Sequence, residues 1–383
     1  MVGLGVRSPE ARDQVRHYCE LAERGLQRMY LGAGMFVETV RGINSGGVLL
    51  PRPEGSNLRH AAVAALGLSR LEEDAQRRVL RGRTAAQLAI STMERALASE
   101  NAGTMALSAW AVAEVAHVFP AQLISALLPR LAPHRPVATA DCAWMLTAGL
   151  AASSIGDATG LIEAAAGRLT AAQRESGLFP KLIPGRKSHL PRPRSASFAD
   201  QVHAIQALSR FSYAQDDEDA LMAAQSCAER LYACQGDPGE WWGRYDVVSG
   251  EVLERDSVYS AHQYATAPMA LLDLLEAGGR DPWWPLLRGL SWIESHSRAL
   301  ISDRDGLIWR RMYRPQRASL LSRIWELLTG TALGQHVSTY SGSEGPIGID
   351  HECRPSELGW LLYAWLAGGV VHGLRANEGD ARA

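Results

Sequence analysis

The densest group of chemically active side chains lies in residues 244–263. It contains Arg244, Tyr245, Asp246, Glu254, Asp256, Tyr259, His262 and Gln263. Tyr259 and His262 are three positions apart, so they share a face wherever a helix includes both. A histidine beside a tyrosine can transfer protons to or from a sugar carbon or a glycosidic oxygen. The alternative is that His262 only caps or braces a loop.

Carboxylates supply the second ingredient of sugar chemistry, because glycoside hydrolysis normally uses two of them facing each other across the scissile bond. The candidates are Asp200, Asp246, Glu254, Asp256, Glu352 and Glu357. Asp200 and Glu357 begin predicted helices, where a carboxylate can serve simply as an N-terminal cap. We expect Asp200 and Asp256 to form the catalytic pair, assisted by Tyr259 and His262.

Tryptophan and arginine indicate what this site would bind. The chain has 11 Trp and only 5 Phe, and Trp suits sugar-stacking platforms as well as cores. Basic residues crowd two stretches: Lys181, Arg186, Lys187, His189, Arg192 and Arg194, then Arg310, Arg311, Arg314, Arg317 and Arg323. On one face they would attract an anionic substrate, although solvated charges that bind nothing are the alternative. The predicted substrate-binding residues are Trp241, Trp242, Arg244, Tyr245, Asp246, Gln263, Trp309, Arg314, Arg354 and Glu357.

Six segments with apolar residues on almost every side predict helices buried all round. They cover residues 58–68, 104–114, 139–149, 200–210, 262–272 and 357–366. Amphipathic segments alternate with them and suit an outer, solvated layer: residues 11–29, 84–98, 121–131, 158–169, 217–233 and 284–297. An open solenoid would need distinct polar caps at its ends. The pattern therefore predicts an all-α fold, an (α/α)6 toroid of six helical hairpins, as one domain over residues 1–375 with a disordered tail at 376–383.

Most outer-to-inner connections carry a Gly followed by apolar residues of strand character, at 46–50, 176–180, 239–243 and 305–309. Glycine permits the turn, and the residues after it favour extended backbone. Residues 241–252 read as a small β-hairpin. Because each connection leads into an inner helix, all four lie on one face of the ring, where long loops on a rigid scaffold usually carry the site.

The repeat resembles the six-hairpin glycosidase-like superfamily, which includes glycoside hydrolases, sugar epimerases and polysaccharide lyases. Residues 258–263 with 267–271, and residues 352–360, are similar to those of poorly characterised bacterial members. The resemblance implies a toroid that acts on carbohydrate, but toroids also include terpene cyclases and thioether-forming cyclases, so the fold leaves the reaction open. No motif of a characterised family matches residue by residue.

The composition and motifs argue against several classes of protein. A net charge of −2 disfavours a nucleic-acid partner, and 5 scattered Cys favour free thiols over a disulfide framework. His351 and Cys353 lack a second pair at ligand spacing, so we expect no metal, and we expect no cofactor. The sequence shows neither a signal peptide nor an apolar run long enough to span a membrane. We therefore expect a cytoplasmic protein.

The leading hypothesis is a glycoside hydrolase or lyase that acts on an acidic or modified saccharide by general acid–base catalysis. The first alternative is a non-catalytic toroid that binds a glycan or a partner protein in a polysaccharide or secondary-metabolite pathway. The second is an isoprenoid cyclase. It is disfavoured because the acidic run at 216–219 opens an outer helix rather than lining the centre of the ring.

Overall fold

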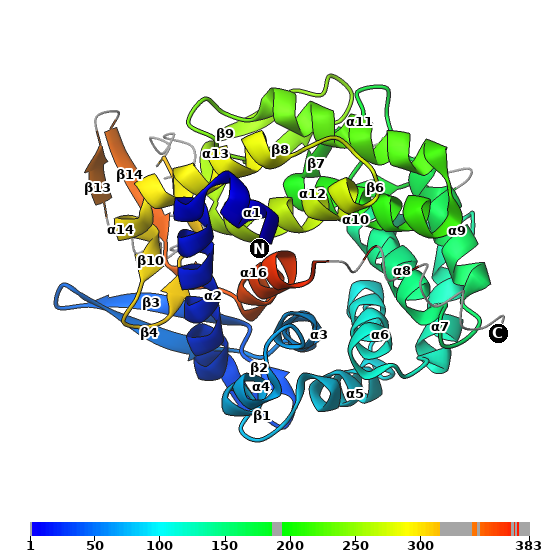
Figure 1. Cartoon of the computed structure of the whole chain (residues 1–383), viewed down its shortest axis with the longest axis horizontal. Helices are drawn as coiled ribbons and strands as arrows, with labels where there is room; N and C mark the ends of the chain where they lie inside the picture. Colours follow the sequence, from blue (N-terminus) through cyan, green and yellow to red (C-terminus); the bar gives the residue numbers. More distant parts are fainter. Residues whose placement is uncertain are drawn as a thin grey trace, which may run out of the picture.

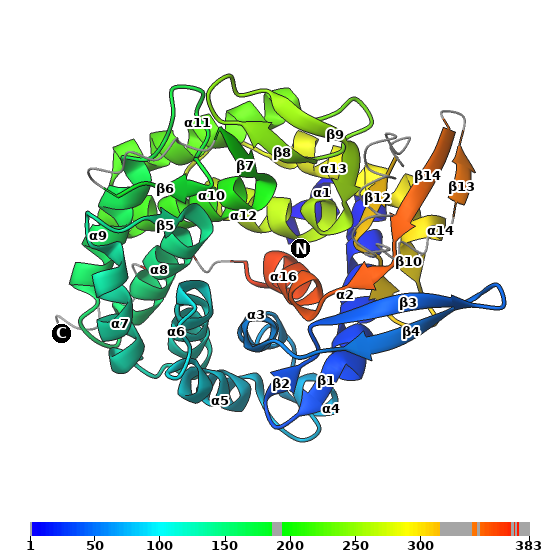
Figure 2. The ribbon, with the colours of Figure 1, turned by 180° about the vertical axis from the view of Figure 1, so that it is seen from behind.

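The computed structural model describes residues 2–185, 194–314, 339–342, 345–368, 371 and 374. Within this part of the chain, six inner helices stand around a central axis (Figures 1 and 2). The fifth inner helix starts with a π-helical turn, η2 (His262–Thr266), that continues into an α-helix. The inner helices are α3 (Leu58–Leu68), α6 (Ala102–Ala116), α8 (Thr139–Ala152), α10 (Phe198–Gln215), η2 with α12 (Ala267–Glu276), and α16 (Pro355–Leu366).

An outer helix precedes each inner one, and the two layers alternate along the chain as predicted. The outer helices are α2 (Pro9–Met29), α5 (Ala85–Ala96), α7 (Ala121–Leu127), α9 (Thr159–Thr170), α11 (Glu218–Cys234) and α13 (Trp283–Ser295). Shorter pieces complete the layer: α1 (Val2–Arg7), α4 (Glu73–Val79), η1 (Leu128–Leu131) and α14 (Ser297–Leu300). The sequence pattern did not predict α4.

The ring closes where the last inner helix, α16, packs against both the first inner helix α3 and the fifth. Gly67 of α3 and Gly359 of α16 make this contact possible, because a Cβ atom on Gly67 would collide with the backbone of Gly359. A Cβ atom on Gly25 of α2 would likewise collide with the carbonyl oxygen of Gly306 and with Leu358. Small residues thus let three segments far apart in the sequence meet, and the predicted (α/α)6 toroid is confirmed.

The strands lie in the connections from outer to inner helices. The first connection contains β1 (Tyr30–Gly32), β2 (Met35–Phe36), β3 (Thr39–Ser45) and β4 (Val48–Glu54). The middle ones contain β5 (Val137–Ala138), β6 (Leu182–Ile183), β7 (Ser195–Ser197), β8 (Trp242–Asp246) and β9 (Val252–Tyr259). The last contains β10 (Ile301–Ser302), β11 (Leu307–Ile308), β12 (Arg311–Tyr313), β13 (Thr339–Gly342), β14 (Gly345–Asp350) and β15 (Glu352–Cys353).

Two sheets organise this loop face. An antiparallel six-stranded sheet has the order β13-β14-β12-β9-β8-β7, and a three-stranded sheet has the order β15-β3-β4. The predicted hairpin is present, with Tyr245 of β8 opposite Val252 of β9. Residues 48–50, 242–243 and 307–308 are strands as expected, whereas residues 176–180 form a turn in which Gly177 has a φ of +85°.

Some expectations fall outside the described residues, namely the disordered tail at 376–383 and the basic residues Arg186, Lys187, His189, Arg192, Arg317 and Arg323. Among the residues that are described, no helix is long and apolar enough to cross a membrane. The same residues contain no group of three or more His, Cys, Asp or Glu side chains arranged to hold a metal ion.

Candidate functional site at the loop end of the ring

The N-terminal ends of the inner helices meet at the loop end of the ring, because every inner helix is entered from an outer-to-inner connection. The third residue of each inner helix is polar in all six cases found in the described part of the chain, when the fifth is counted from Ser260, where helical backbone begins just before η2. These residues are His60, Thr104, Asp141, Asp200, His262 and Glu357. Equivalent positions on a ring of helices lie at similar levels along the axis, so the fold brings these side chains to one end.

Asp200 is fixed by its helix cap. It is only 6% exposed, and its Oδ2 accepts hydrogen bonds from the backbone N–H (2.8 Å) and the hydroxyl (2.7 Å) of Ser197. Burial raises the pKa of Asp200 above its ordinary value; the Ser197 bonds and Lys181 oppose this, and the charge of Asp141 adds to it. Both Ser197 hydrogen bonds fall on Oδ2, so Asp200 can cap its helix and still use Oδ1 in a chemical role.

Asp141, on the neighbouring helix α8, is the residue that sequence reasoning missed. It is half-buried, and burial raises its pKa while Arg59 and Arg130 lower it. A Cβ atom on Gly103 would collide with Asp141 Oδ1, so this glycine makes room for the carboxylate. Aligning the inner helices by their first residues would have found Asp141, because it occupies the same position as Asp200.

A ring side chain follows each aspartate by three residues along its helix, Trp144 after Asp141 and His203 after Asp200. The ring of Trp144 meets that of His203 edge-on with centroids 4.9 Å apart, and His203 lies 5.7 Å from Trp360. The guanidinium of Arg59 lies 5.4 Å from the Trp144 ring, and Arg59 Nη2 donates to Asn101 Oδ1 at 2.8 Å. Burial lowers the pKa of His203 to about 3, so this ring is neutral near pH 7.

Several buried ring nitrogens here have no hydrogen-bond partner in the described structure, namely Trp144 Nε1, His203 Nδ1 and His262 Nδ1. Buried polar atoms are nearly always paired in folded proteins, so unpaired ones mark places where a ligand can bind. Three of them at one end of the ring identify this end as the candidate site.

The predicted proximity of Tyr259 and His262 is found. Their rings are 5.0 Å apart, and His262 also packs against Phe198 at 4.5 Å. The guanidinium groups of Arg310 and Arg311 each lie 5.4 Å from the Tyr259 ring. Burial, together with Arg310, lowers the pKa of His262 to about 3, so His262 enters this site as a neutral imidazole.

Glu357 and Arg354 belong to an ion-pair network beside Tyr259. Arg310 reaches Glu357 (3.3 Å) and Glu352 (3.2 Å), and Arg354 reaches Glu352 at 3.5 Å. The backbone N–H of Arg354 donates to Glu357 Oε2 at 3.2 Å, which makes Glu357 part of a capping box. Burial raises the pKa of Glu357, and the two arginines oppose the increase. These contacts agree with the alternative that Glu357 serves as an N-terminal cap of its helix.

The structure does not bring Asp200 and Asp256 together, because β9 turns its side chains to opposite faces. Ser257 and Tyr259 lie on the same face as Arg311, which donates to Ser257 Oγ. Asp256 and Val258 line a cavity on the other face, together with Trp242, Met312, Arg314 and Trp292 of α13. Asp256, Trp242 and Arg314 therefore line a cavity whose lining residues do not include Tyr259 or His262.

Three further predicted binding residues hold the loops in place. Trp241 is fully buried against Phe198, and the side-chain amide of Gln263 binds the backbone N–H (3.1 Å) and the carbonyl (3.3 Å) of Trp241. Gln201, one helix earlier, binds the backbone of Phe179 in the same way. Trp309 is buried, and its carbonyl accepts a hydrogen bond from Ser260 Oγ.

Three other predicted binding residues, Arg244, Tyr245 and Asp246, lie in the β8–β9 hairpin. Tyr245 is fully buried, and Asp246 shapes the turn by accepting from the backbone N–H of Val248 at 2.8 Å and from Arg194 Nε at 3.1 Å. Arg244 is exposed and donates to Ser195 Oγ at 2.7 Å.

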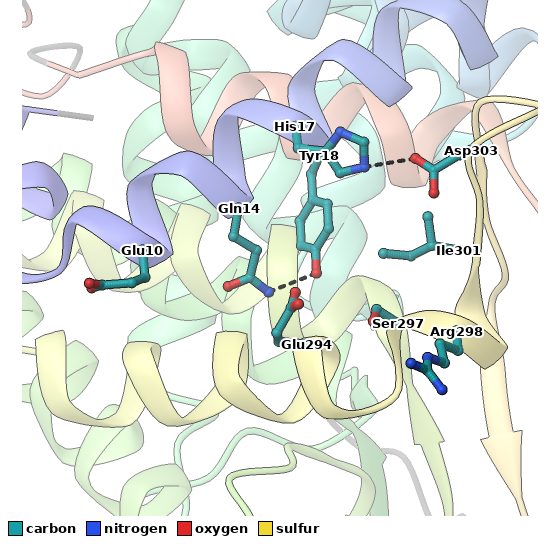
Figure 3. Close-up of a pocket in the computed structure, with 9 residues that line it drawn as sticks. All are labelled: Glu10, Gln14, His17, Tyr18, Glu294, Ser297, Arg298, Ile301 and Asp303. Carbon is teal, nitrogen blue, oxygen red and sulfur yellow. Dashed lines mark hydrogen bonds and ion pairs between the residues drawn. The ribbon is translucent and has the colours of Figure 1, made fainter.

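A separate cavity of about 470 Å³ lies between α2 and α13 (Figure 3). His17 pairs with Asp303 at 2.8 Å, and Gln14 donates to the hydroxyl of Tyr18 at 2.7 Å. Four of its polar side chains thus bind one another in two pairs. None of its lining residues is among those with a buried unpaired polar atom in the described structure, in contrast to the loop end, and we do not assign the chemistry to it.

No protein-family model matches the sequence, and no curated protein matches it either. Among solved structures, an unsaturated glucuronyl hydrolase specific for heparin is similar with a TM-score of 0.59 at 12% identity, covering 95% of this chain and 99% of that one. The Bacillus sp. GL1 enzyme, responsible for glycosaminoglycan degradation, gives 0.58 at 12% identity, covering 95% and 97%. A Streptococcus agalactiae variant of this kind of hydrolase gives 0.55 at 11% identity, covering 92% and 90%.

At this level of identity the likeness establishes the architecture: the chain has the six-hairpin (α/α)6 toroid fold of these glycosidases.

Proposed function

We propose that the protein is a glycoside hydrolase that releases an unsaturated glucuronyl residue from an acidic oligosaccharide, with Asp141 and Asp200 as its carboxylate pair. The observation that carries this proposal is the shared setting of the two aspartates. They occupy the third position of adjacent inner helices, and burial raises the pKa of both. General acid–base catalysis on a glycosidic bond uses a pair of carboxyl groups, of which the acid is held protonated by a raised pKa.

The similar structures support the choice of pair. The S. agalactiae hydrolase has been solved with two different Asp→Asn substitutions, at positions 60 residues apart. Asp141 and Asp200 are 59 residues apart in this chain. This spacing also agrees with the architecture, because one hairpin separates equivalent positions on consecutive inner helices.

The two carboxyl groups divide the work because their surroundings differ. Asp200 is the more buried and keeps Oδ1 free of the Ser197 hydrogen bonds, so we assign it as the group that donates a proton to the leaving oxygen through Oδ1. Asp141 is partly exposed and lies near Arg59 and Arg130, which favour its ionised form, so it accepts a proton from the attacking water. Like charges in proximity resist ionising together, which leaves one proton on the pair over a range of pH.

The neighbouring groups position the sugar. Arg59 forms no ion pair with a carboxylate of the described residues, so its guanidinium is available to the acidic group of a substrate, whose ring would stack on Trp144. The neutral His262 and the hydroxyl of Tyr259 serve as hydrogen-bonding groups rather than as the main acid and base. An anionic substrate and a cytoplasmic location remain parts of this proposal.

The test is turnover of unsaturated disaccharides made by heparin and chondroitin lyases, followed as loss of the ultraviolet absorbance of the unsaturated ring. We expect Asp141→Asn and Asp200→Asn each to lower kcat at least about 100-fold. Asp157→Asn is the matched control, because Asp157 is fully exposed in an inner-to-outer link, and it should retain wild-type turnover. Undiminished turnover in both site variants would contradict the assignment.

A further inference from the structure

Two neighbouring cavities lie on the outward side of the six-stranded sheet, where β9 turns Asp256 away from the ring axis. One, of about 600 Å³, reaches Arg230 of α11, and the other, of about 400 Å³, reaches Trp292 of α13. Figure 2 shows β8 and β9 beside these two helices. Both cavities share four lining residues, and we call the pair of cavities the outer groove; its shared wall is Pro238, Glu240, Trp242 and Arg255.

The shared wall contains two buried polar atoms without partners in the described structure, Glu240 Oε2 and Trp242 Nε1. Glu240 is 9% exposed and Trp242 is 7% exposed. A Cβ atom on Gly236 would collide with the carboxylate of Glu240, so the chain places a glycine where the carboxylate needs room. A carboxylate oxygen accepts hydrogen bonds and an indole N–H only donates them. A ligand that pairs with both atoms must therefore carry a hydrogen-bond donor for Glu240 Oε2 and, close to it, an acceptor for Trp242 Nε1.

The rest of the groove combines aromatic surface with charges of both signs. The guanidinium of Arg255 lies 5.6 Å from the Trp242 ring, and Trp292 is stacked on His296 with centroids 4.4 Å apart. The charged residues that line it are Arg230, Arg255 and Arg314 against Asp237, Glu240, Glu251 and Asp256. This balance gives no preference for a strongly charged ligand, and Glu240 would repel an anion placed next to it.

Sugar hydroxyls fit these demands. Neighbouring hydroxyls of one ring can donate to a carboxylate and accept from an indole N–H, while the C–H face of the ring packs on aromatic side chains. A hydrocarbon ligand would leave both buried atoms unpaired, which disfavours its binding.

We propose that the outer groove is a second carbohydrate site, which binds an uncharged stretch of oligosaccharide apart from Asp141 and Asp200. The inference stands on the groove's own chemistry and does not depend on the reaction proposed above. A saccharide held there lies on the opposite side of β9 from Tyr259. The groove would therefore hold a glycan against the protein without occupying the loop end of the ring.

The test is calorimetric titration with three neutral hexasaccharides: cellohexaose, maltohexaose and N-acetylchitohexaose. We expect at least one to bind the wild type and the Asp200→Asn variant with equal Kd. Trp242→Phe keeps the ring but removes the N–H, and Glu240→Gln removes the charge. Each should weaken binding about fivefold, the loss expected for one hydrogen bond.

Trp241→Phe is the matched control. Trp241 also has a buried indole nitrogen without a partner in the described structure, but it belongs to the core and does not line the groove. It should leave Kd unchanged, and thermal unfolding verifies that all variants are folded. Absence of binding by all three saccharides, or equal weakening by Trp241→Phe, would overturn the second site. Loss of binding in Asp200→Asn would also overturn it, whereas turnover that survives in that variant contradicts only the proposed reaction.

Discussion

At the loop end of the ring, Trp144, His203 and His262 bury ring nitrogens that lack partners in the described structure, whereas the opposite end pairs its most deeply buried charge completely. There, Arg210 of α10 donates to Asp273 (2.6 Å), to Glu114 (3.4 Å) and to the hydroxyl of Tyr363 (2.7 Å). Its three guanidinium nitrogens thus hold three other inner helices, α12, α6 and α16.

The difference separates stability from function within one fold. The network around Arg210 closes the ring at the helix C-termini, where Glu114 also accepts from Trp110 Nε1 (2.6 Å) and from Tyr363 (2.7 Å). One buried nitrogen beside it, Arg70 Nε, has no partner in the described structure. The loop end leaves three buried ring nitrogens unpaired, which costs stability. Burial raises the pKa of Asp273 in the network as well as the pKa values of Asp141 and Asp200, but Arg210 and Gln206 hold Asp273 in place. Substitutions in the Arg210 network should therefore lower the free energy of unfolding, whereas substitutions at the loop end should lower turnover.

The largest expected effect is the loss of Arg210. Arg210→Met leaves Asp273 and Glu114 buried beside an apolar side chain, so the free energy of unfolding should fall by about 3–5 kcal/mol. Urea unfolding measures the change. The control is Arg280→Met, which breaks an exposed pair with Glu229 and should cost no more than about 1 kcal/mol. Equal losses in the two variants would contradict the structural role of the closed end.

At the loop end we expect a large loss of turnover with little loss of stability. Asp200→Asn should lower kcat at least about 100-fold, because the proton donor is removed. Its free energy of unfolding should change by less than about 1 kcal/mol, because Asn still accepts the hydrogen bonds of the helix cap. Parallel measurement of turnover and urea unfolding checks this, and a strongly destabilised Asp200→Asn would show that the loop end is also structural.

Gly103→Ala is a finer probe. The added methyl group must displace Asp141, so kcat/KM should fall about tenfold, as expected for a small misplacement of a catalytic group. Gly167→Ala on the outer helix α9 is the control, because a Cβ there meets nothing within 4 Å. It should raise the free energy of unfolding by about 0.5–1 kcal/mol and leave kcat/KM unchanged.

The pH dependence of stability tests the loop end by a different measurement. The pKa of His203 is about 3 in the fold and about 6.5 in the unfolded chain, so the unfolded state binds a proton first as pH falls. Stability is therefore lost on acidification from about pH 6.5 towards 3. His203→Phe should reduce this slope by about 1.4 kcal/mol per pH unit between pH 4 and 6. The raised pKa values of Asp141 and Asp200 act in the opposite sense, stabilising the fold as pH falls, and an unchanged slope would mean that His203 is protonated in the fold.

The sequence predicted the architecture well because apolar periodicity reports burial directly. The inner helix at 58–68 agrees with the structure at both ends, and the outer helices agree within a few residues. It predicted the site less well, because periodicity within a strand does not reveal which face meets the axis. Asp256 and Tyr259 were grouped by proximity in sequence, yet β9 separates them. Asp141 was passed over because it lies in an apolar helix with no polar neighbour to draw attention to it.

The contact between Gly67 and Gly359 also constrains how the chain can fold during synthesis. The first inner helix is made early, but the surface against which it packs belongs to α16, and β3 pairs with β15 just before that helix. A nascent chain that ends before residue 352 thus lacks the neighbour of its first hairpin and keeps an apolar side of α3 open. Because contacts so distant in sequence form slowly, the ring can close only after nearly all of the chain has left the ribosome.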